Sequence, residues 1–130
     1  MVFPGFKAII KPATTKQQGD RAEDDALKLL HQSGLRLLER NYRTPGRGGG
    51  EIDLIMRDPD GTLVFVEVRK RQDARQGGAL ASVTPIKQKR LVFAARHYLL
   101  RWPTLPPCRF DVVAFESGDA HWYKGAFDAI

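Results

Sequence analysis

Apolar side chains recur at helical spacing in two segments of the chain. In residues 17–32 they stand three and four positions apart, and Ser33-Gly34 follows as a typical helix stop. In the second segment Thr84 occupies an N-cap position, Pro85 the first helical position, and Pro103 ends the pattern. The apolar stripe of this second segment consists of Ile86, Leu91, Ala94, Ala95, Tyr98 and Trp102. We therefore expect one helix over residues 17–32 and a second from Pro85 to Trp102.

Short apolar runs bounded by turn residues predict strands between and after these helices. The runs are residues 35–43, 51–57, 62–69 and 108–115, with 121–127 as one more short edge strand. The order helix, three strands, helix, strand predicts an α/β fold in which helices flank a central mixed sheet. Residues 1–15 show no clear period, so we expect a loose N-terminal arm ahead of a single domain at 16–130.

The strands at 51–57 and 62–69 each carry acidic residues within an apolar run. Because side chains alternate across a strand, Ile52, Leu54 and Met56 are expected on one face of the first strand and Asp53 on the other. In the next strand Glu67 and Arg69 are expected to share a face with Leu63 and Phe65, opposite the valines at 64, 66 and 68.

The turn between these strands decides whether the two acids meet. A three-residue loop, Pro59-Asp60-Gly61, places Asp53 directly opposite Glu67, whereas a two-residue turn pairs Asp53 with Val66. Proline cannot take the positive φ that the two-residue turn requires, so we expect the longer loop. The carboxylates would then be neighbours on one face of the hairpin.

Like charges directly opposite each other destabilise a sheet, so a cation between them is expected. Mg²⁺ prefers carboxylate and water oxygens, and commonly takes one or two carboxylates together with substrate phosphates. The alternative is a solvated strand face on which Asp53 and Glu67 pair with Arg69 or Arg71. Glu23 has two interpretations: it completes a capping box with Asp20, or it adds a third carboxylate to the site.

Positive charge is concentrated after the second acid. The chain has 21 Lys and Arg against 15 Asp and Glu, a net charge of +6. Such a surface suits a nucleic acid or an acidic membrane, and a cluster beside carboxylates favours the nucleic acid. We expect a cytoplasmic protein that binds DNA and no membrane, since no run approaches a membrane span. The cluster begins at Arg69, which is a candidate for the site itself. The predicted nucleic-acid-binding side chains are Lys70, Arg71, Arg75, Lys87, Lys89 and Arg90.

Other kinds of site find little support in the sequence. The chain contains no GxSxG elbow, P-loop, Rossmann fingerprint or HExxH helix, and GRGGG lacks the lysine and following helix of a phosphate loop. Cys108 is the only cysteine and is interpreted as a small core residue of a protein in a reducing compartment. The role of Asp111 is left open.

An acid on one strand followed by an acid-x-base triplet on the next resembles the PD-(D/E)XK nuclease superfamily. More specifically, the chain resembles the YraN family of predicted endonucleases, which is related to Holliday-junction resolvases. The segments that carry this resemblance are GDRAEDDA (19–26), RNYR (40–43), GEIDLIMRD (50–58), LVFVEVRKR (63–71), VTPIKQKRL (83–91) and RFDVVAF (109–115).

The resemblance implies a restriction-endonuclease-like core and a divalent-metal-dependent DNA endonuclease, with branched DNA as substrate and a homodimer as its state. It implies that Asp53 and Glu67 hold Mg²⁺ or Mn²⁺, with the Val68 carbonyl as a further ligand and Glu23 as the helix acid. Arg69 stands where the superfamily motif has lysine, and arginine stays protonated. A non-catalytic nucleic-acid-binding module on a nuclease scaffold is therefore the alternative, and Lys87 is a candidate helper.

Overall fold

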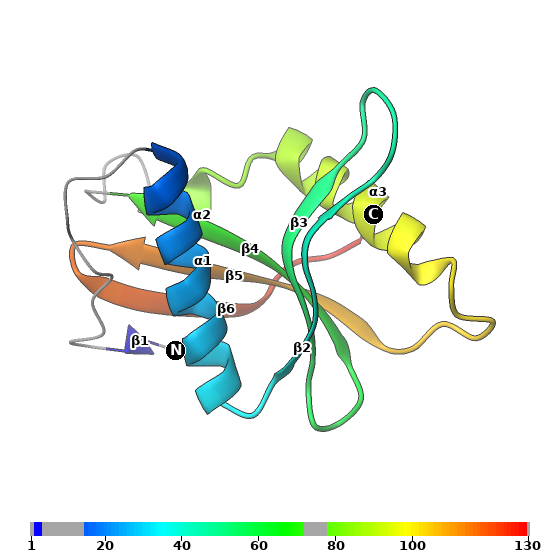
Figure 1. Cartoon of the computed structure of the whole chain (residues 1–130), viewed down its shortest axis with the longest axis horizontal. Helices are drawn as coiled ribbons and strands as arrows, with labels where there is room; N and C mark the ends of the chain where they lie inside the picture. Colours follow the sequence, from blue (N-terminus) through cyan, green and yellow to red (C-terminus); the bar gives the residue numbers. More distant parts are fainter. Residues whose placement is uncertain (1, 4–14, 72–77, 130) are drawn as a thin grey trace.

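The computed structural model describes residues 2–3, 15–71 and 78–129, which form one mixed sheet with helices on both faces (Figure 1). The sheet order is β1-β6-β5-β4-β3-β2. Among the described strands, β4 and β5 pair in parallel and every other pair is antiparallel. This confirms the predicted fold class. The strands are β1 (Val2–Phe3), β2 (Arg36–Arg43), β3 (Glu51–Arg57), β4 (Leu63–Arg71), β5 (Cys108–Glu116) and β6 (Asp119–Phe127).

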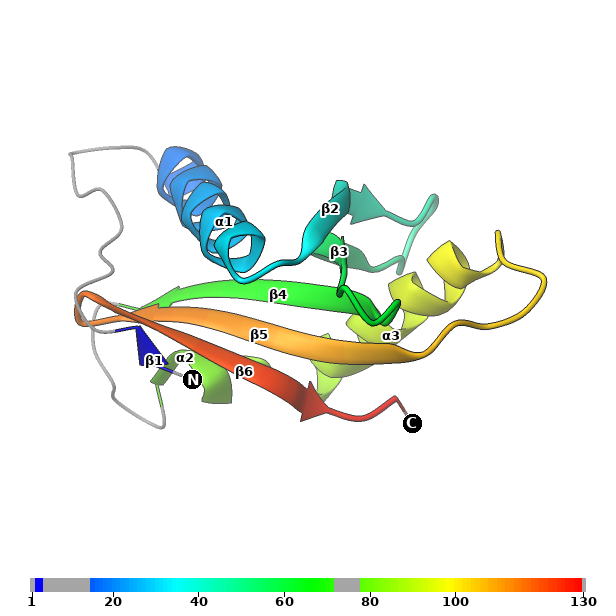
Figure 2. The same ribbon diagram turned by 90° about the horizontal axis from the view of Figure 1, so that it is seen from below.

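The helices divide between the two faces of the sheet, as Figure 2 shows. On one side α1 (Thr15–Gln32) buries Ala22, Ala26, Leu29 and Leu30 against the sheet. On the other side lie the single-turn α2 (Gly78–Ala81) and α3 (Pro85–Leu99), which buries Leu91, Ala94, Ala95 and Tyr98. Both faces of the central strands are thus covered by apolar side chains, which explains their nearly continuous apolar sequences.

The first helix confirms its predicted end but not its predicted start. Gly34 takes a φ of 99°, and the Ser33 and Leu35 N–H groups donate back to carbonyls of the last turn, as a glycine stop requires. Because α1 begins at Thr15, Asp20 and Glu23 lie within the helix. The capping-box interpretation of these two acids is therefore wrong.

Helix α3 begins where the sequence predicts. The Thr84 hydroxyl accepts the Lys87 N–H as an N-cap, and Pro85 is in the first turn. The helix ends at Leu99, and Trp102 follows in a turn with its ring 5.2 Å from the ring of Tyr98. Ile86 is 66% exposed, so the expectation that it belongs to the core stripe is wrong. It lies on the side of α3 that faces away from the sheet.

The last strand has a larger role than the short edge strand expected from the sequence. β6 pairs with β5 over most of its length and buries Ala120 and Trp122. On its other side it pairs with β1, through Val2 and Phe3, where a loose arm was expected. The rest of the expected arm, residues 4–14, lies outside the described residues.

Candidate functional site

The β3–β4 turn has the three-residue loop that the proline predicts. The Asp58 N–H donates to the Thr62 carbonyl at 2.9 Å, and Gly61 has a φ of 93°. The ladder runs from Arg57↔Leu63 to Leu54↔Val66. Continued by one step, this register sets Asp53 opposite Glu67, so the expected register is confirmed.

A bend in the neighbouring hairpin turns Asp53 out of its expected alternation. The pairs Arg40↔Leu54 and Tyr42↔Ile52 place Asn41 opposite Asp53, and Asn41 has a φ of 55° within strand β2. Leu54 packs in the cluster on the α1 side, whereas Ile52 packs in the cluster on the α3 side. The prediction that Ile52 and Leu54 share a face is therefore wrong, because a left-handed residue interrupts the alternation here.

Asp53 and Glu67 come into direct contact beside this bend. Asp53 Oδ2 accepts the Val68 N–H at 2.8 Å, and a hydrogen bond joins the two carboxyl groups. Burial raises the pKa of Glu67 to about 9, with further contributions from the charge of Asp53 and from that hydrogen bond. Burial also raises the pKa of Asp53, while the Val68 N–H opposes the rise. The pair therefore shares a proton at neutral pH.

The carboxyl pair lines a cleft of about 380 Å³. Its opposite walls come from the loop between β2 and β3, which runs beside α3 (Figure 1), and from α3 itself. A Cβ on Gly50 would lie 2.0 Å from the Arg90 carbonyl oxygen, so only glycine permits this approach of strand to helix. The side chains around the pair include Arg43, Thr44, Glu51, Lys87, Arg90 and Leu91.

The loop wall is a part of the site that the sequence reasoning missed. Thr44 is buried, and its hydroxyl accepts the Gly50 N–H at 2.8 Å. The Thr44 N–H in turn donates to the Gly50 carbonyl, which closes the loop on itself. The glycines of TPGRGGG were interpreted only as a flexible turn. The available signal of an ordered loop was the threonine at its start, because Thr hydroxyl groups often bond to nearby backbone groups in turns.

Two basic residues from different elements act on the carboxyl pair. Arg69 Nη1 lies 3.8 Å from Glu67 Oε1, and its Nε donates to the Ser82 hydroxyl at 2.9 Å. Lys87 lines the cleft, and its charge acts to lower the pKa of Glu67. The structure thus brings Lys87 from α3 to the carboxyl pair, while Arg69 is held by Ser82 on the loop after α2.

Glu23 lies near the pair but is held by another residue. Its Oε1 is 3.4 Å from Arg40 Nε, and Arg40 also contacts Asp24 at 2.6 Å. Burial raises the pKa of Glu23, the charge of Asp53 adds to the rise, and Arg40 opposes it. Glu23 therefore interacts with Asp53 through its charge, and its direct contact is with β2.

The structure distributes the predicted basic cluster over several surfaces. Lys87 and Arg90 line the cleft, and Lys70 is exposed at the end of β4. Lys89 lines a separate groove between α3 and Asp128, which follows β6. Arg75 and the side chain of Arg71 lie outside the described residues. Successive residues of a helix are rotated by about 100°, which separates Lys89 from Lys87 and Arg90. The basic cluster is therefore not a single surface.

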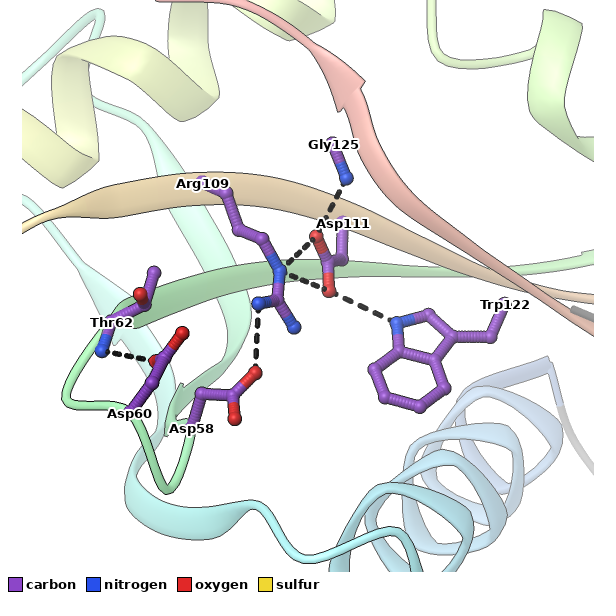
Figure 3. A network of polar contacts seen from close by, with 7 residues as sticks. All are labelled: Asp58, Asp60, Thr62, Arg109, Asp111, Trp122 and Gly125. Carbon is purple, nitrogen blue, oxygen red and sulfur yellow. Dashed lines mark hydrogen bonds and ion pairs between the residues drawn. The ribbon is translucent and has the colours of Figure 1, made fainter.

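Asp111, whose role the sequence left open, forms the centre of a separate network (Figure 3). It is fully buried, and its carboxylate accepts from Arg109 Nε, from Trp122 Nε1 at 3.0 Å and from the Gly125 N–H at 3.0 Å. Arg109 also donates to Asp58 at 2.8 Å. This network ties β5 to β6 and to the β3–β4 turn, and a structural role follows for Asp111.

The Asp53–Glu67 pair fits a hard divalent cation by its donor chemistry. The charge of Asp53 and its hydrogen bond raise the pKa of Glu67, and a divalent cation would neutralise both carboxyl groups where they now share a proton. Between the residues that the structure describes, no group of three or more Asp, Glu, His or Cys side chains is assembled for a metal. A metal here would be held by Asp53 and Glu67, with water or substrate oxygens completing its coordination.

Comparison with known proteins identifies the family. The model of the "Uncharacterised protein family UPF0102" matches residues 22–115. The chain belongs to the UPF0102 family. A UPF0102 protein of Albidiferax ferrireducens is 61% identical over 129 residues, covering 99% of each chain. A UPF0102 protein of Paracidovorax citrulli is 62% identical over 126 residues, covering 97% of this chain and 92% of the relative.

A solved structure, "The structure of Pyrococcus Furiosus SfsA in complex with Ca2+", matches with a TM-score of 0.37 and 17% identity. The match covers 93% of this chain and 67% of that one. Among the described residues of this UPF0102 protein, no helix is long and apolar enough to cross a membrane.

Proposed function

We propose that this cleft is the active site of a divalent-metal-dependent DNA endonuclease of the PD-(D/E)XK type. The observation that carries the proposal is the Asp53–Glu67 pair: two carboxyl groups in contact, withdrawn from water, in a cleft walled by basic side chains. Groups with strongly perturbed pKa values in a cleft are typical of functional sites. The solvated strand face that the sequence also allowed finds less support, because the Glu67 side chain is only 14% exposed.

The residues of the cleft divide the work of phosphodiester hydrolysis between them. Asp53 and Glu67 would hold Mg²⁺ or Mn²⁺, which when bound supplies a water of lowered pKa and charge to stabilise phosphate oxygens. The Val68 N–H fixes the Asp53 carboxylate through its 2.8 Å hydrogen bond. Lys87 is the lysine of the site, because it faces the pair from α3 where Arg69 replaces the lysine of the superfamily motif.

The cleft walls suggest how a nucleic acid would be held. Arg43, Lys87 and Arg90 line the space around the carboxyl pair, and cations so placed neutralise backbone phosphates. Branched DNA as the substrate and a homodimer as the working state are part of the proposal and rest on the resemblance to resolvases.

A cleavage assay tests the proposal. Labelled four-way junction, flap, single-stranded and linear duplex DNA are incubated with the purified protein and Mg²⁺, Mn²⁺ or EDTA. We expect metal-dependent products that EDTA abolishes and that Asp53→Asn lowers by about 100-fold or more, since a change behind a metal ligand already costs about 10- to 100-fold. The matched control is Asp60→Asn, an exposed turn acid of the same type. Products that survive Asp53→Asn would contradict the site.

A second candidate, a nucleic-acid-binding module without turnover, is favoured by one observation. Arg69 cannot act as a base, and its guanidinium is engaged by Ser82 and Glu67. This function predicts salt-dependent DNA binding without products under any divalent metal. Arg69→Lys and Lys87→Met separate the two: an enzyme that uses Lys87 loses cleavage in Lys87→Met, whereas a decayed enzyme gains cleavage only in Arg69→Lys.

A further inference from the structure

The outer side of α3 carries a line of exposed apolar side chains. Ile86, Phe93 and Leu100 are 66%, 54% and 79% exposed. They follow one another at every seventh position, which places them along one line of a helix. Leu100 is the C-cap, but its φ of −59° and ψ of −19° are helical, so it continues the line. We call these three residues the α3 ridge.

Basic side chains flank the ridge on both sides. At about 100° per residue, Lys89 and Arg96 fall on one side of the line and Arg90 on the other. The helix contains no Asp or Glu. The α3 ridge is therefore an apolar line within a positively charged face, and it is separate from the buried stripe that packs against the sheet.

A groove lies along one side of the α3 ridge. It has a volume of about 300 Å³, its apolar wall comes from Pro85, Val92 and Phe93, and Lys89 and Arg96 stand at its rim. Asp128, next to the C-terminus, also lines it. A groove of this kind accepts a side chain that projects from a partner, and the residues around it supply charge to orient that partner.

We propose that the α3 ridge docks a helix of a partner protein whose apolar stripe is flanked by carboxylates. The seven-residue spacing of the ridge matches the repeat by which two helices pack along a shared seam. The basic flanks select acidic positions beside that seam and repel a second copy of α3, which would present the same cations.

The other polyanionic or apolar occupants fit this surface less well. Ile86, Phe93 and Leu100 offer a phosphate backbone no hydrogen-bond donor. A flat lipid surface also has no side chain to fill the groove. The groove shares no lining residue with the cleft that holds the carboxyl pair, although Arg90 lies between the two surfaces. The proposal therefore stands or falls independently of the proposed activity.

The test uses the full chain and a designed peptide. The probe is a fluorescent three-heptad helix with leucines on one stripe and glutamates beside it; its matched control has lysines in place of the glutamates. We expect micromolar anisotropy binding of the acidic peptide only, weakened at least about tenfold by Phe93→Ser. Leu105→Ser, a similarly exposed apolar residue outside the ridge, should leave binding unchanged.

Charge reversal gives a second, independent readout. The double variant Lys89→Glu/Arg96→Glu should lose the acidic peptide and gain the lysine peptide, a swap that misfolding cannot produce. Absent binding, or binding indifferent to Phe93→Ser, would overturn the proposal. Three other results would also overturn it: a dimer in light scattering, binding to phosphatidylserine vesicles, or binding to DNA, if Phe93→Ser abolishes the interaction. In each case an occupant other than an acidic helix would cover the ridge.

Discussion

Asp111 and the Asp53–Glu67 pair are both withdrawn from water on strands of one sheet, but their surroundings differ. Donors from Arg109, Trp122 and Gly125 converge on the Asp111 carboxylate (Figure 3). The Asp53 and Glu67 carboxyl groups face each other, and the nearest cation contact is Arg69 at 3.8 Å from Glu67. A buried carboxylate with its own donors supports the fold, whereas two in mutual contact are held at a cost to stability.

The largest expected change in stability comes from removing the charge of Asp111, the carboxylate whose hydrogen bonds are satisfied by donors. Asp111→Asn leaves one acceptor oxygen where several donors converge, so its amide group must face one of them. We expect the free energy of unfolding to fall by about 3 kcal/mol. Asp53→Asn is the matched change in the Asp53–Glu67 pair, and it should not lower the free energy of unfolding. Urea unfolding of both variants measures this difference in stability. Equal losses in the two variants would contradict the distinction between Asp111 and the Asp53–Glu67 pair.

Removing the proton-sharing acid should have a smaller effect of opposite sign. The raised pKa of Glu67, about 9 against an ordinary 4.5, means that the folded metal-free protein binds more protons than the unfolded chain between these values. Stability that is present below pH 4.5 is therefore lost as pH rises toward 9. Glu67→Gln should flatten this profile and gain on the order of 2 kcal/mol at pH 8.

Thermal unfolding from pH 5 to 9 in EDTA checks this profile. Glu39→Gln, at an acid on β2 whose side chain is 40% exposed and contacts Arg101, controls for the loss of one negative charge. An unchanged pH profile in Glu67→Gln would show that the pair does not hold the extra proton.

Metal binding should depend on pH in the opposite direction. A cation at Asp53 and Glu67 must displace the shared proton, so we expect its apparent affinity to rise by up to about tenfold per pH unit below pH 9. Calorimetric titration of Mn²⁺ at pH 6, 7 and 8 measures the slope, and heats in buffers of different ionisation enthalpy count the released proton. A flat affinity would place the metal elsewhere.

The smallest expected change in stability concerns the close approach of β3 to α3 at Gly50, beside the carboxyl pair. Gly50→Ala inserts a Cβ against the Arg90 carbonyl, so we expect a loss of about 1 kcal/mol or more of stability. Gly19→Ala, on α1 with open space around it, should instead gain up to about 1 kcal/mol from helix propensity. Chemical denaturation compares the two variants. Equal effects would show that β3 and α3 do not depend on the close approach at Gly50.

Local rules predicted the hairpin that carries the acids. Proline at position 59 and glycine at 61 select the loop, and the loop sets the register that brings Glu67 opposite Asp53. The same rules failed at Ile52, because the positive φ of Asn41 reverses the alternation and nothing in the residue types of β3 announces it. They also failed at Ile86, because an apolar residue at helical spacing can face water as readily as the core.

The sequence by itself determined the order of the elements, the β3–β4 register and the two acids, because periodicity, turn chemistry and charge are local properties of the chain. Only the tertiary structure decided that Lys87 rather than Lys89 faces the pair, and that Arg40 holds Glu23. It also separated the saturated Asp111 from the unsaturated Asp53 and Glu67. Burial and donor supply depend on residues far apart in sequence, so the chemical state of each carboxyl group follows from packing.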